Sequence, residues 1–547
     1  MAFIKTQKLV FNEDGTIKSG SAAIIDTTYV KDAKYHTKHS VRERLGKVLF
    51  ISSDKKVGIF QSPNRGLVEY NANLDSFKEV SLDDERIAHK KLKESTQIHT
   101  VFGDAYFLFK FMKNEHLLEV LSKVFTKNED MQRMIAHIIH GIAKDGSRIT
   151  CDNFIEKSFI SYLCKDLNFN TLKSDTSFFS KLGNDDIKVS FFKEFVKAMK
   201  KLDPEFGKAC FIDSTPLPND IENNPFNALS CHGINSTGVM MRLVLIADNK
   251  TGLPVWYEII PGNVLDISTV MTVVEDVITT LGIEIGDLVL DAGYISKNLL
   301  QAFNVDSEKT LIGRMPAKKG YPYKDLYWEF KEQFNRGKYQ FIRNSHSYFG
   351  KQKQIEIFGV KEYAYLYIDR NNALQYFNKY LLNHGEEYAK LKDKDKDWKM
   401  VCGGYFVIIS NLDLTPEEML SRYFARVDIE GFFKTSKHYL DLLPIAKWKD
   451  ETIRGGILFD MIKTIVFLKL RSQVNEFGTS VSDILGKLSS LMCFRKDDTV
   501  TVETPNKQVK KIYSGIFKEN VPSHVNLQDE KKLLGGGSST LVKSKDY

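Results

Sequence analysis

The sequence predicts a mixed α/β protein in which one sheet carries the functional site, preceded by a β-rich module and a helical module. Residues 2–70 hold short apolar runs separated by turns, which favours strands. Residues 101–205 carry apolar side chains at three-and-four spacing, which favours helices. From Lys208 to Met315 the pattern alternates in the order βββαβαβ, which is typical of a mixed sheet.

The N-terminal module has turn signals and an excess of basic residues. Asn12–Gly15 predicts a hairpin turn, and Ser62–Gly66 predicts a second turn. Residues 1–60 contain 11 Lys and Arg but six acids, so the segment carries +5 of the chain's net +7. Such a segment attracts a polyanion such as nucleic acid, and an ordinary solvated surface is the alternative explanation.

The elements of the next two modules follow from periodicity. The predicted helices of the helical module are Val101–Phe125, Glu129–Ala143, Cys151–Asp166 and Ser190–Leu202. The predicted core strands are Lys208–Asp213, Gly238–Ala247, Leu253–Ile260, Asp287–Asp291 and Thr310–Met315, with helices at Val264–Leu281 and Ile295–Asn304. Two of these strands end in an acid, Asp213 and Asp291, and α/β sheets build their sites at the carboxyl ends of strands.

Residues 317–412 interrupt the core pattern with an aromatic-rich insertion. Its predicted elements are strands at Tyr339–Arg343, Gln354–Phe358, Tyr363–Tyr367 and Val401–Ser410, a helix near Asn372–Lys392, and a solvated loop at the charge run Lys390–Lys399. After it, Thr415-Pro-Glu-Glu418 has the composition of a helix start. The predicted domains are therefore residues 1–100, 101–205, 206–316, 317–412, 413–480 and 481–547, the last with a disordered Gly-Ser-rich tail at 535–547.

A polar block at Tyr423–Lys437 is the most informative part of the chain. At ~100° per helical residue, Arg426, Glu430 and Lys437 fall within about 60° of Tyr423 on one stripe. Asp428 faces away from this stripe. One acid among a phenol and two cations suits a metal-bound phosphodiester better than a hydrophobic core.

Three acids on separate elements can supply a two-metal site. Asp213, Asp291 and Glu430 offer oxygen ligands, which suit Mg²⁺ or Mn²⁺ rather than zinc. Two such ions about 4 Å apart activate the attacking oxygen and stabilise the leaving oxygen of a phosphoryl transfer. Each acid alone is more simply a turn or cap residue; the combination with the stripe favours the site.

The chain resembles the DDE transposases of bacterial insertion sequences, in the insertion-sequence-four-like superfamily. That group carries the signature Tyr-x2-Arg-x3-Glu-x6-Lys, which Tyr423, Arg426, Glu430 and Lys437 match at every position. Its first two acids resemble Asp213-Ser-Thr215 and Asp291-Ala-Gly-Tyr294, and its Pro-Gly-Asn stretch resembles Pro261-Gly-Asn263. The N-terminal stretch Val41–Gly46 is similar, more loosely, to one branch of the superfamily. Relatives often carry Arg-Gly-His where this chain has Arg454-Gly-Gly456, which puts one supporting polar contact in doubt.

The resemblance implies an RNase H-like core with a β-rich insertion between the second and third acids. It implies that Asp213, Asp291 and Glu430 hold two Mg²⁺ or Mn²⁺ ions, and that Tyr423, Arg426 and Lys437 bind DNA phosphates. Members of the superfamily can pass through a hairpin intermediate with a flipped base, for which Trp328 is the candidate stacking residue; a Trp covering the insertion's own core is the alternative.

The expected function is a DNA transposase that binds terminal inverted repeats of an insertion sequence, cleaves the ends and joins the 3′-OH to target DNA. The expected partners are double-stranded DNA and a second copy of the chain. A catalytically inactive, transposase-derived DNA-binding protein or repressor is the alternative, and a sequence-tolerant nuclease is a third possibility. No apolar run is long enough for a membrane span, and six cysteines without a Cys-x-x-Cys pair argue against a zinc ribbon or a disulfide scaffold, so a cytoplasmic, nucleoid-associated bacterial protein is expected.

Overall fold

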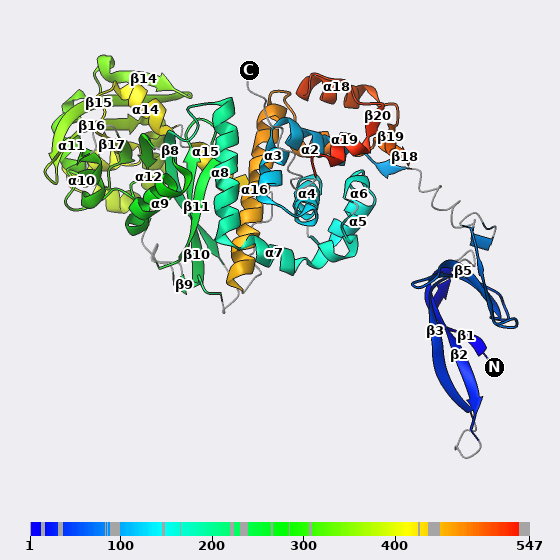
Figure 1. Ribbon diagram of the computed structural model, residues 1–547. Helices are drawn as coiled ribbons and strands as arrows, with labels where there is room; N and C mark the ends of the chain where they lie inside the picture. The colour runs from blue at the N-terminus through cyan, green and yellow to red at the C-terminus, as the bar shows by residue number, and fades with distance from the viewer. Residues whose placement is uncertain are drawn as a thin grey trace, which may run out of the picture. The chain divides into compact units, whose positions relative to one another are not determined.

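The computed structural model forms two compact units, which are described separately (Figure 1). It describes the chain except residues 1, 12–16, 31–36, 82–83, 85, 88–98, 145–147, 165, 219–223, 230–238, 264–265, 284, 306–308, 425–426, 436–448 and 535–547. For residues 266–271, 278, 305 and 427–430 it describes the backbone alone. The first unit comprises residues 1–100 with 493–496, and the second comprises the remainder.

The first unit is a six-stranded antiparallel sheet in sequence order. Its strands are β1 (Ala2–Phe11), β2 (Ile17–Tyr29), β3 (Thr37–Ile51), β4 (Val57–Ser62), β5 (Gly66–Asn71) and β6 (Ser76–Glu79). One face holds a core that includes Ile24, Leu45 and Phe60. The predicted turn at Ser62–Gly66 joins β4 to β5 and is confirmed, whereas Asn12–Gly15 lies outside the described residues, between the paired strands β1 and β2.

The Val41–Gly46 stretch has a structural role in this sheet. Arg42 on β3 binds Asp26 on β2 (2.8 Å) and Asp75 in the β5–β6 turn (2.6 Å), so one guanidinium ties three segments together. Leu45 is buried in the core. Gly46 has a φ of +78°, and a Cβ there would lie 2.3 Å from the carbonyl oxygen of Gln61, so only glycine fits.

The second unit begins with the predicted helical module, which the structure divides more finely. Its helices are α2 (Gly103–Asn114), α3 (Leu117–Val124), α4 (Asn128–Ala143), α5 (Cys151–Glu156), α6 (Ile160–Leu163), α7 (Thr176–Leu182) and α8 (Asp185–Leu202). The predicted Val101–Phe125 helix is two helices, because His116 adopts a left-handed φ of 58° between α2 and α3.

The helical module packs on α16 (Asp450–Asn475), a helix that is buried on most of its surface. Helix α16 packs against α4 and α7 on one side and against strand β11 (Pro254–Pro261) on the other. Together with α8, the last helix of the module, it lies between the other module helices and the sheet (Figure 1). A Cβ on Gly455 would lie 1.7 Å from the carbonyl oxygen of Phe179, which explains a glycine at the α7–α16 crossing.

The predicted core is half of a ten-stranded mixed sheet. Its strands are β8 (Ala209–Pro218), β10 (Val239–Asp248), β11, β12 (Asp287–Leu290) and β13 (Thr310–Arg314), with a short β9 (Ala228–Leu229) beside β10. They lie in the order β11-β10-β8-β12-β13; β10 is antiparallel to β8 and β11, and β12 is parallel to β8 and β13. Helices α9 (Asp266–Leu281) and α10 (Lys297–Val305) connect β11 to β12 and β12 to β13, as predicted.

The insertion extends this same sheet. Strands β14 (Gln340–Arg343), β15 (His346–Ile357), β16 (Val360–Asp369) and β17 (Tyr405–Ser410) continue it in the order β13-β17-β16-β15-β14. Helices α11 (Tyr323–Phe330), α12 (Arg370–Ala389) and α13 (Asp393–Val401) accompany them. The prediction of a solvated loop at Lys390–Lys399 is therefore wrong for most of this segment, which is helical from Asp393 onward. Acids in the first turn of α13 and Lys399 in its last turn complement the helix dipole, and this outweighs the polarity of the run.

The C-terminal part follows α14 (Pro416–Phe424), α15 (Val427–Lys434) and α16. Its elements are α17 (Val481–Leu488), β18 (Met492–Lys496), β19 (Thr499–Val502), α18 (Lys507–Ile516), β20 (His524–Asn526) and α19 (Leu527–Lys531). The predicted tail at 535–547 lies outside the described residues. Among the described helices, none combines the length and apolarity that crossing a bilayer requires.

Candidate functional site

Strand β8 places Asp213 where its pairing with a parallel neighbour ends. The apolar residues Cys210, Phe211 and Ile212 form the buried start of the strand. Contrary to the sequence prediction, β8 does not end at Asp213 but runs to Pro218, because residues 213–218 stay paired with antiparallel β10. On its other side the ladder with β12 ends at the pair Ile212–Leu290.

Asp291 follows Leu290 directly, so the two acids occupy the next positions beyond that last pair. Adjacent strands lie about 4.8 Å apart, which brings the Asp213 and Asp291 backbones side by side at the carboxyl edge of the sheet. The chain then turns away, with the N–H of Tyr294 donating to the carbonyl oxygen of Asp291 (3.1 Å). Both side chains are half-buried, and Asp213 Oδ1 accepts from the N–H of Ser214 (2.8 Å).

Helix α14 brings Tyr423 to this edge. The predicted helix start is confirmed: Thr415 and Glu418 form a reciprocal capping box, with Thr415 N–H donating to Glu418 (3.0 Å) and Glu418 N–H donating to Thr415 Oγ1 (3.3 Å). Tyr423, only 4% exposed, lies on the last turn, and its hydroxyl donates to Asp291 Oδ1 (3.4 Å). A signature residue and the second acid, 132 positions apart in sequence, thus meet.

Helix α15 carries Glu430 and packs against β8, the strand of Asp213. The structure describes only the backbone of Glu430, so its carboxylate is not placed. The following turn is held by Arg471 of α16, which donates to Thr435 Oγ1 (2.8 Å), while that hydroxyl donates to the carbonyl oxygen of Gly431 (2.7 Å).

Arg426 and Lys437 lie outside the described residues. Whether the chain from Tyr423 to Lys437 forms the single helical stripe predicted from the sequence therefore stays a prediction. The described parts are two helices, α14 ending at Phe424 and α15 beginning at Val427.

Sequence reasoning missed Arg242. This residue is 7% exposed on β10, next to the strand of Asp213, and its guanidinium donates to the hydroxyl of Ser214. Because Arg242 pairs with Pro216 and side chains alternate along β8, the guanidinium and Ser214 lie on the face of the sheet opposite the Asp213 side chain. The available signal was a single cation inside the apolar run from Val239 to Ala247.

Trp328 lies half-buried on α11. Its ring packs against Tyr327 at a centroid distance of 4.7 Å, and the ammonium groups of Lys394 and Lys331 lie 4.9 and 5.6 Å from its centre. These contacts are all within the insertion, as expected for a Trp that covers its own subdomain, and base stacking stays a prediction.

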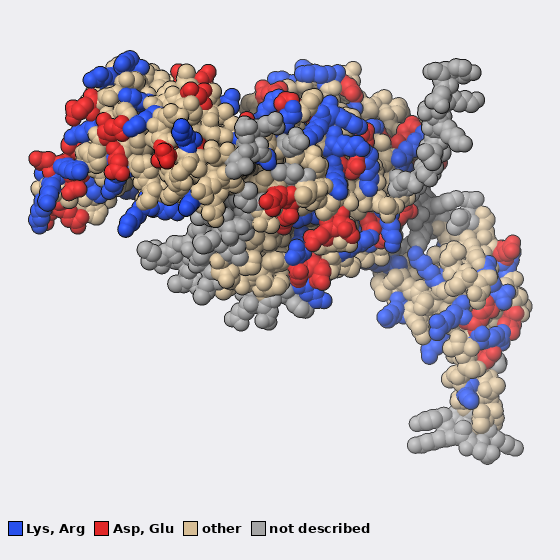
Figure 2. Space-filling model, turned by 60° about the vertical axis from the view of Figure 1, so that its left-hand side comes forward, with Lys and Arg blue, Asp and Glu red and all other residues tan. Residues whose placement is uncertain are grey.

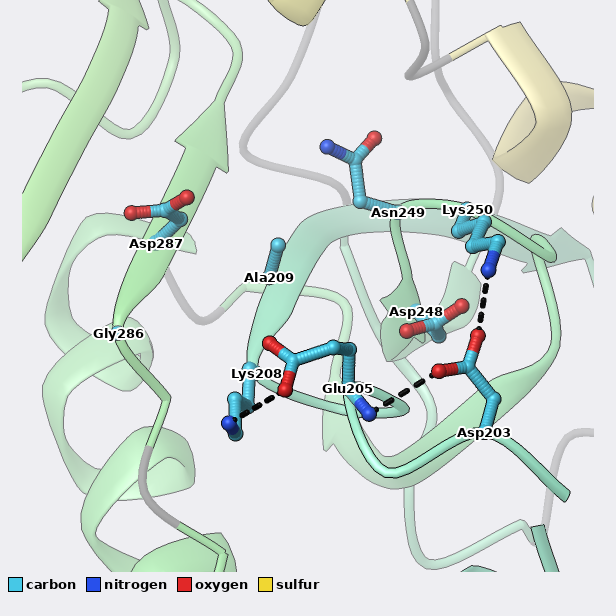
Figure 3. Close-up of a pocket in the computed structure, with 9 residues that line it drawn as sticks. All are labelled: Asp203, Glu205, Lys208, Ala209, Asp248, Asn249, Lys250, Gly286 and Asp287. Atoms are coloured by element: carbon cyan, nitrogen blue, oxygen red, sulfur yellow. Dashed lines mark hydrogen bonds and ion pairs between the residues drawn. The ribbon is translucent and has the colours of Figure 1, made fainter. Parts of the chain in front are cut away.

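A second group of acids lies at the opposite end of the same strands, around a pocket of about 420 Å³ (Figure 3). Asp248 accepts from the N–H of Gly207 (2.9 Å) and from both the N–H and the hydroxyl of Thr251. Asp203 pairs with Lys250 (2.6 Å). These acids are held by local partners that cap turns, so this pocket has the features of a structural region.

A buried cysteine, histidine and aspartate also lie together in the helical module. His137 contacts Cys151 Sγ (3.7 Å) and Asp175 (3.3 Å), an arrangement superficially like a nucleophile, base and orienting acid. Burial raises the pKa of Cys151 to about 12 and lowers that of His137, so the thiol stays protonated and inert.

Among the side chains that the structure describes, no cluster of three or more His, Cys, Asp or Glu has the arrangement of a metal site. The described part of the candidate set is the Asp213–Asp291 pair, to which α15 adds Glu430. Neighbouring carboxylates provide hard oxygen donors, which fit Mg²⁺ or Mn²⁺.

Comparison with known proteins points to the same segment. Residues 205–446 match the family model of the transposase DDE domain, a match that contains Asp213, Asp291 and Glu430 and supports a DDE transposase assignment for this part of the chain. No curated protein matches the chain. A piggyBac transposase synaptic complex with hairpin DNA aligns over 71% of this chain and 79% of its own, with 10% identity and a TM-score of 0.38, a likeness too low to carry an argument.

Proposed function

We propose that the protein is a DNA transposase of a bacterial insertion sequence, with an RNase H-like core, that cleaves the element's ends and joins the 3′-OH to target DNA. The observation that carries the proposal is the register of β8 and β12, which makes Asp213 and Asp291 neighbours, and the packing of α15, the helix of Glu430, against β8 supports it. The match of residues 205–446 to the transposase DDE domain supports the same chemistry.

In this proposal Asp213, Asp291 and Glu430 hold two divalent ions. When bound, Mg²⁺ or Mn²⁺ supplies charge stabilisation for the attacking and leaving oxygens of the phosphodiester. Tyr423 orients Asp291 through its hydroxyl. Arg426 and Lys437 would contact phosphates, and Trp328 would stack on a flipped base if a hairpin intermediate is used.

The N-terminal sheet would bind the terminal inverted repeats. In the register of β1, β2 and β3, Ala23 pairs with Lys5 on one side and with Arg44 on the other. Ser21, two residues before Ala23 on β2, pairs with Lys47. By the alternation of strands, Lys5, Arg44 and Lys47 therefore share the face opposite the core, and all three are exposed. Elsewhere, basic and acidic side chains alternate over the visible face of each unit (Figure 2), so a local basic row is a better candidate for phosphate contacts than overall charge.

The test is strand transfer in vitro with Mg²⁺, using the DNA that flanks the gene as the donor. The full chain should nick this DNA and join it to a target plasmid. Glu430→Gln should abolish both steps, whereas Glu417→Gln, on an exposed acid of α14, should leave them intact. Specific DNA binding without cutting in any divalent metal would instead favour an inactive DNA-binding protein.

Synapsis of two ends requires two active sites, so the active species is proposed to be a homodimer on DNA. Its measurement is the mass of the protein–DNA complex in solution, in which two chains per pair of ends are expected.

A further inference from the structure

A second pocket, of about 720 Å³, has a wall that begins at the residue after the third acid. It is lined by residues of α15, α16, α17 and the end of α4. Gly431 and Lys434 of α15 form part of its wall, and Gly431 follows Glu430 directly. Since a helix rises about 1.5 Å per residue, Lys434 lies only about 6 Å along the axis from Glu430.

The pocket's charged lining is entirely basic. Its cations are Lys144, Lys434 and Arg471, and no Asp or Glu is among the lining residues in the part of the chain that the structure describes. Within the described chain, neither Lys434 nor Arg471 forms an ion pair; Arg471 is fixed instead by its bond to the buried hydroxyl of Thr435. Lys144 pairs with Asp104 (3.9 Å), so Arg471 is the lining cation that is both held in place and without an acid partner among the described residues. Such a cation favours an anionic ligand.

The rest of the lining suits a ligand that is only partly charged. Phe467, half-buried on α16, lines the pocket together with Val481 and Leu485 of α17. Thr479, Ser480 and Ser482 also line it, although the hydroxyls of Thr479 and Ser480 are bonded to Asp483 at the start of α17. Basic groups for phosphates, an aromatic ring and hydroxyls are together the features that bind single-stranded nucleic acid.

We propose that this pocket takes one unpaired nucleotide of the DNA strand, with its phosphate on Arg471 and Lys434 and its base against Phe467. A duplex is too wide to enter a cavity of this size, whereas a single nucleotide fits and must leave the base stack to do so. This inference rests on the proposed function, because it names the part of the substrate that is held beside the three acids.

The test measures binding of the full-length protein to two fluorescent DNAs in EDTA, so that no cleavage occurs. One is a short blunt duplex, and the other is the same duplex with a thymidine overhang. The overhang is placed at the 3′ end in one arm of the experiment and at the 5′ end in another arm. Arg471→Gln and Lys434→Gln should each weaken binding to one overhang DNA about tenfold, because each removes a charge-assisted hydrogen bond to phosphate. Binding to the blunt duplex should change less than about twofold.

Phe467→Leu should weaken overhang binding about tenfold through lost stacking. The matched control is Lys487→Gln. Lys487 lies on α17, a helix that lines the pocket, but it pairs with Asp483 and is not itself a lining residue. Lys434 is exposed, so its substitution keeps the test valid even if Arg471→Gln disturbs the fold.

Unchanged overhang binding in Lys434→Gln and Arg471→Gln would overturn the inference, and so would an equal loss on both DNAs, which would indicate a general backbone contact. Failure of the proposed function is a separate result: overhang binding by the parent protein would persist, but no divalent metal would support cleavage.

Discussion

Acids of the same kind lie near both ends of strands β8 and β12, but their surroundings differ. At the amino end, Asp248 and Asp203 are held by turn N–H groups, a threonine hydroxyl and Lys250. At the carboxyl end, Asp213 and Asp291 follow the last pair of the β8–β12 ladder, and the hydroxyl of Tyr423 donates to Asp291. The first arrangement uses acids to hold turns together, whereas the second brings two carboxylates from different strands to one edge of the sheet, a combination of hard oxygen donors that suits divalent cations.

Acid identity alone therefore does not mark a site; the partners around each acid do.

Asp213→Asn and Asp291→Asn should each lower metal-dependent strand cleavage by about a thousandfold or more, because a neutral amide cannot hold the proposed ions. The melting temperature should stay the same or rise, since each substitution relieves repulsion between neighbouring carboxylates. Cleavage assays on flanking DNA and thermal melts check both parts. Cleavage that survives in either variant would show that the carboxyl end is not catalytic.

Asp248→Asn should have the opposite pattern: it should lower stability and leave cleavage unchanged. Asp248 is 3% exposed and accepts three hydrogen bonds, so losing its charge should lower the free energy of unfolding by about 3 kcal/mol. Urea denaturation measures this loss, and the cleavage rate per folded molecule should be unchanged at low temperature. A stable but inactive Asp248→Asn protein would reverse the roles assigned to the two ends.

Glu362 on β16 belongs to neither group. It is 2% exposed, its Oε2 has no hydrogen-bond partner among the described residues, and burial raises its pKa to about 7. The folded state thus binds this proton more tightly than the unfolded chain, whose pKa is near 4.5, so Glu362 costs stability progressively as pH rises from about 4.5 to about 7. Glu362→Gln should stabilise the protein by roughly 2 kcal/mol above pH 7 and by little at pH 4.5. Equal melting shifts at both pH values would contradict a buried, titrating Glu362.

Tyr423→Phe should have the smallest effect, a fall of about threefold to tenfold in cleavage, because it removes one neutral hydrogen bond to Asp291. Fold and DNA affinity should be retained if the hydroxyl only orients the acid. A loss as large as that of Asp291→Asn would instead give the phenol a direct part in the chemistry.

The sequence predicted most elements of the core because hydrophobic periodicity depends on local chain geometry. It predicted strand β12, the helices that follow β11 and β12, and the helix start at Thr415. It erred where distant contacts decide. Strand β8 continues past Asp213 because β10 pairs with it. Similarly, the insertion joins the core sheet through β17, a pairing that its aromatic composition did not reveal. One error has a local cause: α2 and α3 separate at His116, which has a left-handed backbone.

By itself the sequence determined the identity and spacing of the reactive groups: two acids after apolar strands and a third acid within a four-residue signature. Only the tertiary structure decided that Asp213 and Asp291 are neighbours and that Tyr423 reaches Asp291. The physical reason is that periodicity reports which face of an element is apolar, whereas strand order and register depend on long-range pairing that no local stretch of sequence encodes.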